Sequence, residues 1–74
     1  MSQITANSNI LGGKPIVAGT RISVEFVLQM LASDMNEEEI LEEYPQLSVA
    51  DIHACILFAA NSIKNDVYLD LQPA

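Results

Sequence analysis

The sequence predicts a mainly α-helical fold, in which a bundle of three short helices follows a small β-hairpin arm and precedes an extended tail. The bundle is predicted from three apolar-periodic stretches within residues 24–63, each of which begins after a residue that caps helices well. The arm is predicted from residues 1–23, which contain all three glycines and short β-branched segments. We therefore expect one small domain over residues 1–63 and a C-terminal tail over residues 64–74.

The arm contains two β-branched segments, residues 16–17 and 20–22, which Ala18 and Gly19 separate. Glycine adopts a positive φ without steric strain, so we expect the chain to turn at Gly19 and form a short hairpin. A lone hairpin is only marginally stable in water. We therefore expect it to lie on the helices or to pair with another chain.

The first two helices are predicted from their caps and ends. Ser23 is the expected N-cap of the first helix, and Asn36 with Glu39 has the spacing of a capping box at the start of the second. The second helix should end at Tyr44, because the residue before a proline avoids the helical conformation. The core face expected for the first helix consists of Val24, Val27, Leu28 and Leu31.

The third helix should begin after Ser48, with Asp51 completing a second capping box. Its apolar residues recur at helical spacing and should form one stripe that faces the core. This expected stripe consists of Val49, Ile52, Ile56, Ala59, Ala60 and Ile63. The connections between the helices are short, as in a compact bundle.

Composition excludes several functional classes. Three basic and ten acidic residues give a net charge of −7, which disfavours nucleic-acid binding by the chain alone. The longest apolar run, residues 54–60, is too short to cross a membrane, and the N-terminus lacks the segments of a signal peptide. The single cysteine fits a reducing compartment. We expect a cytoplasmic protein without membrane association.

The sequence contains no arrangement that predicts catalysis. One histidine, His53, and one cysteine, Cys55, are too few for a zinc site built from this chain alone, and we expect a surface position for His53 and a buried one for Cys55. The run from Gly12 to Pro15 lacks the spacing of a phosphate-binding loop. We expect no enzymatic activity, no cofactor and no metal.

Three large side chains fall outside the predicted core faces: Phe26, Met30 and Phe58. The arm or the tail could cover them, but half of all residues are apolar, which is more than so small a core readily hides. Aromatic residues and methionine are enriched in protein interfaces. We therefore favour an interface with another chain and expect a homodimer or a larger assembly.

The tail carries a second candidate binding segment. Its residues Val67, Leu69 and Leu71 alternate with polar residues, which is the periodicity of a strand. Such a segment could dock on its own bundle, on a second copy or on a partner protein. We favour the partner protein.

Two of the three basic residues, Lys14 and Arg21, lie in the arm. Arg21 could form a surface ion pair with the glutamates of its own chain, which would contribute little to stability. Alternatively, its guanidinium could contact a phosphate or the carboxylates of a partner. We treat both residues as candidate contacts to nucleic acid or to a partner's carboxylates.

Residues 12–24 read GGKPIVAGTRISV and resemble the signature of a small bacterial family, domain of unknown function four-three-three (DUF433). Further matches fall at residues 38–40, 44–45, 47, 51–52 and 54, so the resemblance extends over about residues 7–62. It implies a homeodomain-like three-helix fold preceded by a β-arm. It also implies an antitoxin role in type II toxin–antitoxin pairs, where the partner is a PIN-like ribonuclease.

These observations lead to two functional hypotheses. The first is an antitoxin-like interaction protein that binds and neutralises a ribonuclease toxin. The alternative is a helix-turn-helix transcriptional regulator, whose third helix would enter the major groove of DNA. No basic residue lies at the start of that helix, among Ser48, Val49, Asp51 and Ile52. We therefore expect DNA binding to be weak, or to occur only in a complex through Lys14 and Arg21.

Overall fold

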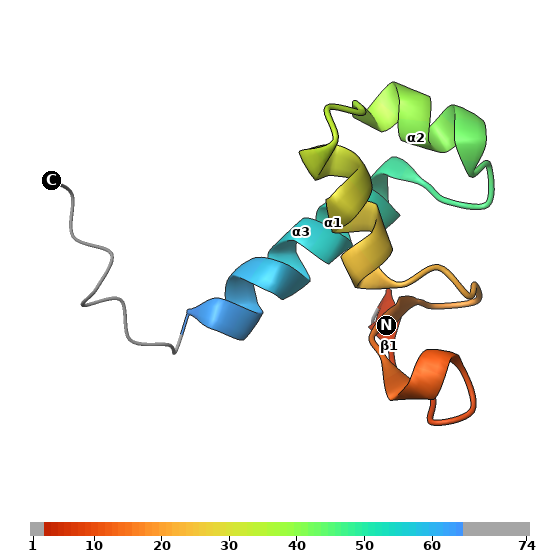
Figure 1. The fold of residues 1–74 in the computed structure, drawn as a ribbon, viewed down its shortest axis with the longest axis vertical. Helices are drawn as coiled ribbons and strands as arrows, with labels where there is room; N and C mark the ends of the chain where they lie inside the picture. The colour runs from red at the N-terminus through yellow and green to blue at the C-terminus, as the bar shows by residue number, and fades with distance from the viewer. Residues whose placement is uncertain (1–2, 65–74) are drawn as a thin grey trace, which may run out of the picture.

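A computed structural model of the chain describes residues 3–64 and confirms the mainly helical fold with its N-terminal arm (Figure 1). The two short strands are β1 (Ile4–Thr5) and β2 (Ile16–Val17), with a 3₁₀ turn η1 (Leu11–Gly13) between them. The three helices are α1 (Val24–Ala32), α2 (Glu37–Glu43) and α3 (Val49–Ile63). The tail residues Val67, Leu69 and Leu71 lie outside the described residues. Within residues 3–64, no helix has the length and hydropathy that a membrane crossing requires.

The arm differs from the predicted hairpin in the identity of its main strand pair. β1 pairs with β2 in antiparallel register, with Ile4 opposite Val17. The expected partner, residues 20–22, does turn back at Gly19 (φ 81°), and Ile22 accepts a hydrogen bond from the Val17 amide at 2.9 Å. This second contact is limited to an isolated bridge between Ile16 and Ser23. β2 therefore lies between β1 and the segment that leads into α1.

The helix caps occur where the sequence places them. The Ser23 hydroxyl accepts a hydrogen bond from the Phe26 amide at the start of α1. The capping boxes of α2 and α3 form with both reciprocal hydrogen bonds, between Asn36 and Glu39 and between Ser48 and Asp51. α2 ends at Glu43, one residue before Tyr44. These predictions are confirmed. The sequence could give them correctly because each depends on residues no more than four positions apart.

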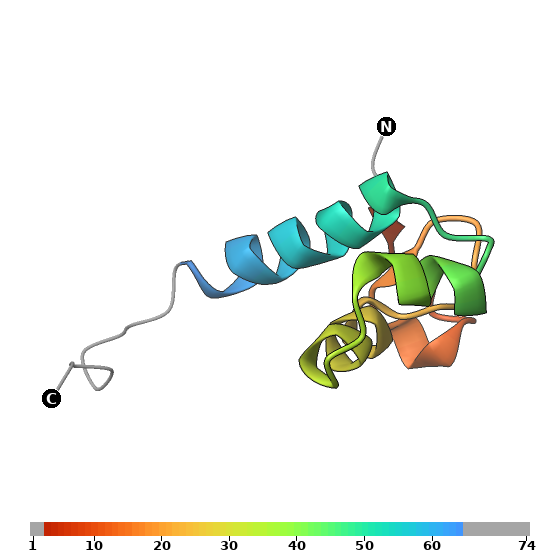
Figure 2. The ribbon, with the colours of Figure 1, turned by 90° about the horizontal axis from the view of Figure 1, so that it is seen from above.

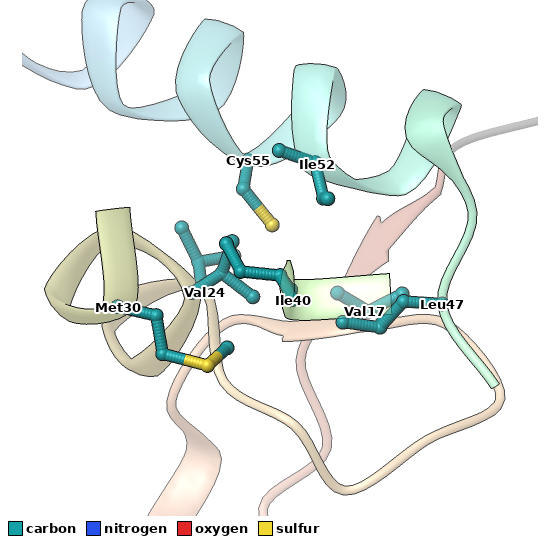
Figure 3. Close-up of a cluster of buried hydrophobic side chains, with 8 residues drawn as sticks. Val17, Val24, Met30, Ile40, Leu47, Ile52 and Cys55 are labelled. Atoms are coloured by element: carbon teal, nitrogen blue, oxygen red, sulfur yellow. The ribbon is translucent and has the colours of Figure 1, made fainter. Parts of the chain in front are cut away.

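The core joins the second strand to all three helices (Figure 3). Met30 belongs to this core, with only 6% of its surface exposed, so its assignment to a binding surface is wrong. After α1 the chain reverses at Asp34 (φ 69°) and brings Ile40 into the same cluster. The core thus includes the side of α1 that carries Met30, which the apolar spacing of α1 did not indicate. Leu28 and Leu31, which were expected on the core face, are only partly buried.

The stripe predicted for the third helix exists, but the chain covers only part of it. Ile52 is fully buried, as is Cys55 beside it, whereas Ile56 and Ile63 are 45% and 54% exposed. The reason is geometric: the C-terminal half of α3 extends past α1 and α2 in both views (Figures 1 and 2). The expectation that the whole stripe lies in the core is therefore wrong for Ile56, Ala60 and Ile63, and it is also wrong for Val49, which is exposed at the first position of α3.

Candidate protein-binding surface

α3 carries most of the exposed large apolar side chains of the described chain. Five of the seven lie on this helix, and the other two are Leu11 and Phe26. The five on the helix are Val49, Ile56, Leu57, Phe58 and Ile63. An apolar surface gathered on one element is typical of an interaction site rather than of scattered surface residues.

A groove lies between α1 and the C-terminal half of α3, with a volume of about 560 Å³. We call it the α1–α3 groove. Its walls are apolar: α1 contributes Val24, Leu28 and Ala32, and α3 contributes Phe58, Ala59 and Ile63. Phe58, which the sequence analysis assigned to an interface, is therefore part of this groove, with 37% of its surface exposed.

One ion pair lies at the edge of the α1–α3 groove. Lys14 Nζ donates a hydrogen bond to Glu25 Oε1 at 2.9 Å, and both side chains are 59% exposed. Solvent-exposed pairs of this kind contribute little to stability, because water screens them. Lys14 can therefore exchange Glu25 for a carboxylate of another protein at small free-energy cost.

A second, smaller pocket lies on the other side of Lys14, and we call it the basic pocket. Leu11, Lys14, Arg21 and Phe26 line it, together with Ile22 and Ser23. Phe26 is 38% exposed and makes an edge-to-face contact with Tyr44, with ring centroids 5.5 Å apart. Arg21 is exposed and forms no ion pair within residues 3–64, although the chain is strongly acidic. The two arm cations predicted as contacts thus lie at one pocket.

The structure separates the two aromatic residues that the sequence placed in one interface. Phe58 lines the α1–α3 groove and Phe26 lines the basic pocket, while Lys14 lines both. Leu11 was missed by the sequence analysis. Its backbone is left-handed (φ 50°), a conformation that is rare for a residue other than glycine. The only local sign of it is a leucine directly before two glycines.

The groups that could carry chemistry are dispersed in the described chain. His53 Nε2 lies 2.8 Å from Glu37 Oε2 on the surface, which supplies a carboxylate partner that the sequence did not reveal. Burial raises the pKa of the Cys55 thiol to about 11, and the nearby Asp51 carboxylate adds to this effect. No three His, Cys, Asp or Glu side chains within residues 3–64 are grouped as metal ligands.

The N-terminal turn of α3 is occupied by its own cap. Ser48 and Asp51 bond each other's backbone amides, and the second Asp51 oxygen accepts from Gln3 Nε2 at 3.0 Å. Ile52 is in the core. Of the four residues that the DNA-binding hypothesis would place at base edges, only Val49 offers a free side chain, and it is apolar.

Comparison with known proteins places the chain in a family. Residues 4–59 match the family described as Protein of unknown function (DUF433). The chain is 36% identical over 62 residues to the Uncharacterized protein y4eO of Sinorhizobium fredii (strain NBRC 101917 / NGR234), an alignment that covers 82% of this chain and 28% of that protein.

The fold is also similar to a crystal structure of a DUF433 member protein from Anabaena variabilis ATCC 29413, with a TM-score of 0.79 and 23% sequence identity. This match covers 82% of the present chain and 60% of the other. The chain thus spans less than two thirds of either relative. The family match extends from β1 into the C-terminal half of α3, so it includes the basic pocket and most of the groove walls. The chain belongs to the DUF433 family.

Proposed function

We propose that this protein is an antitoxin-like interaction protein, which binds and neutralises a PIN-like ribonuclease as one half of a type II toxin–antitoxin pair. In this proposal it acts in the cytoplasm, as a homodimer or a larger assembly, and has no catalytic role of its own. Nucleic acid is bound weakly, or only by the complex with the toxin.

The observation that carries the proposal is the apolar α1–α3 groove, with Phe58 exposed on its α3 wall. Burial of apolar surface contributes roughly 25 cal/mol per Å², so a partner that fills this groove gains affinity from each side chain it covers. An apolar groove between two helices is suited to an amphipathic helix of a partner. The toxin is therefore expected to place such a helix, or an apolar loop, along Phe58.

The basic pocket supports the same proposal. PIN-like ribonucleases hold their metal ions with carboxylates, and Arg21, which forms no ion pair within residues 3–64, presents a planar donor that suits a carboxylate. Arg21 and Lys14 would contact acidic residues of the toxin beside the groove. Inhibition would follow if these carboxylates were withdrawn from metal binding or covered. The tail residues Val67, Leu69 and Leu71 are assigned to the same partner.

The test is co-purification of this chain with the product of the neighbouring gene, followed by measurement of the dissociation constant. Phe58→Glu places a charge in the groove and should weaken the complex at least about 100-fold, which is the effect of losing a central interface residue. Ala50→Glu is the matched control, because it adds the same charge at an exposed position of α3 that does not line the groove.

Arg21→Glu should weaken the complex about tenfold and make binding less dependent on salt. Deletion of residues 66–74 should remove complex formation while circular dichroism shows the helices intact. Unchanged affinity in Phe58→Glu, Arg21→Glu and the truncated chain would contradict the proposal. An inhibitory complex that forms equally well when Phe58→Glu blocks the groove would also contradict the proposal.

A further inference from the structure

The exposed part of the third helix contains a regular apolar line that does not coincide with the α1–α3 groove. Val49, Ile56 and Ile63 follow one another at intervals of seven residues, and Ala60 lies between the last two. Residues seven apart lie along one side of a helix, which is the spacing of the contact line in a coiled coil. The three large members are 44%, 45% and 54% exposed. We call this line the α3 stripe.

The α3 stripe is uncharged in a chain whose net charge is −7. No acidic or basic residue lies between Asp51 and Lys64, and His53 is the only titratable side chain in that interval apart from the buried Cys55. The groups facing His53 come from α2, where Glu37 is its partner. Acidic residues elsewhere on the surface would repel a second copy of the chain, whereas this face would not.

The charges at the two ends of α3 are of opposite sign. Lys64 follows the C-terminal end, while the N-terminal half lies beside α2, whose seven residues include five glutamates. Two copies of α3 in antiparallel orientation would therefore bring each lysine toward the acidic helix of the other copy. A parallel pair would place like charges together at both ends.

We propose that the α3 stripe binds the same stripe of a second copy of this chain, in antiparallel orientation about a two-fold axis near Ile56. Val49 of each copy then meets Ile63 of the other, and the small Ala60 allows the helices to approach. Ile63 also borders the α1–α3 groove, but Phe58 does not belong to the stripe. This inference names the surface for the self-association proposed above and requires no toxin.

The expected dimer is weak. A helix of 15 residues is about 22 Å long, and a pair of such helices buries less than the roughly 800 Å² per partner of a standard interface. We expect a dissociation constant on the order of 10 µM. Sedimentation equilibrium of the full chain between about 1 and 200 µM should therefore show monomer passing into dimer.

Ile56→Glu should raise the dissociation constant about 100-fold, because the two-fold axis brings two new charges together on an apolar surface. Ala50→Glu adds the same charge to α3 outside the stripe and should leave the dimer unchanged. Lys64→Glu changes an exposed residue at the end of α3 and should weaken the dimer about fivefold, so it tests the antiparallel orientation if the first variant unfolds.

Cross-linking supplies an independent measurement. Ile56→Cys places two thiols near the axis and should give a disulfide-linked dimer under mild oxidation, whereas Ala50→Cys should not. The native Cys55 stays out of this reaction because it is buried and burial raises its pKa to about 11.

The inference is overturned if the chain is monomeric at all concentrations, or if Ile56→Glu and Lys64→Glu leave the dimer intact. It is separable from the proposed function, because Phe58→Glu should weaken toxin binding at least about 100-fold and keep the dimer. Ile56→Glu should instead weaken the dimer and leave toxin binding unchanged.

Discussion

The two halves of α3 have similar composition and very different surroundings. The N-terminal half begins at a capping box and contributes Ile52 and Cys55, both with no exposed surface, to the core. The C-terminal half continues the same apolar spacing, but Leu57 is 61% exposed, and Ile56 and Ile63 of the α3 stripe are about half exposed. The difference teaches that the spacing of apolar residues determines which side of a helix is apolar. What covers that side depends on how far the other elements reach.

The largest expected effect comes from truncating one isoleucine in each half. Ile52→Ala should lower the free energy of unfolding by about 3 kcal/mol, because it leaves a cavity in the core. Ile56→Ala should cost less than about 1 kcal/mol, since nearly half of that side chain is already in water. Urea denaturation followed by circular dichroism measures both, in an Ile63→Glu background that prevents pairing of the stripe. Equal losses would show that the two halves are equally packed.

A smaller effect should follow pH through Cys55. Its pKa is about 11 in the folded chain against a usual value of 9.0, so the folded state keeps its proton where the unfolded state loses it. The contribution to stability is complete below pH 9 and is lost as the pH rises, with a loss of about 2 kcal/mol by pH 11. Unfolding curves of the wild type and Cys55→Ala at pH 8 to 11 should therefore converge. A constant difference would contradict the buried position of the thiol.

The smallest effect concerns serine hydroxyls at the two ends of the helix. Ser48→Ala removes an N-cap whose hydroxyl accepts from the Asp51 amide, and should destabilise the fold by about 1 kcal/mol. Ser62→Ala removes only an exposed hydroxyl that donates to the Phe58 carbonyl, and should change stability by less than about 0.5 kcal/mol. Thermal unfolding of the two variants provides the comparison, and a larger loss in Ser62→Ala would reverse it.

Features that depend on near neighbours in the chain could be predicted from the sequence. The caps at Ser23, Asn36 and Ser48, the turn at Gly19 and the end of α2 before Tyr44 all arise from contacts over a few residues. Side-chain bonds to the first free amides of a helix determine such boundaries almost regardless of the rest of the fold.

Features that depend on distant segments could not be predicted in the same way. Met30 is buried in a cluster that also contains Ile40 of α2, which the chain reaches after it reverses at Asp34, and no property of α1 indicates this arrangement. β1 has only two residues, so it has no periodicity, and its pairing with β2 spans most of the arm. Ile4 also packs against the core, which adds to the stability of the pair.

The candidate site was predicted in part. Phe26 and Phe58 are exposed, as their positions outside the predicted core faces indicated, and the structure brings Lys14 and Arg21 to one pocket. The sequence could not show that the two aromatic residues belong to different hollows that meet at Lys14. Nor could it reveal Leu11, because its exposure follows from an unusual backbone conformation rather than from its place in a pattern.

The Asp51 carboxylate, described above as a helix cap, also bonds the side chain of Gln3, 48 positions earlier in the sequence. Gln3 directly precedes β1, and β1 itself contacts α3, so the first strand completes its contacts only when the last helix is present. During synthesis on a ribosome, β1 emerges first but must wait for α3 before this end of the domain can close. The residues of the α3 stripe beyond Ile52 and Cys55 emerge later still. The contacts between the two ends of the domain therefore form at the same stage of synthesis at which the α3 stripe becomes available for the association that we propose.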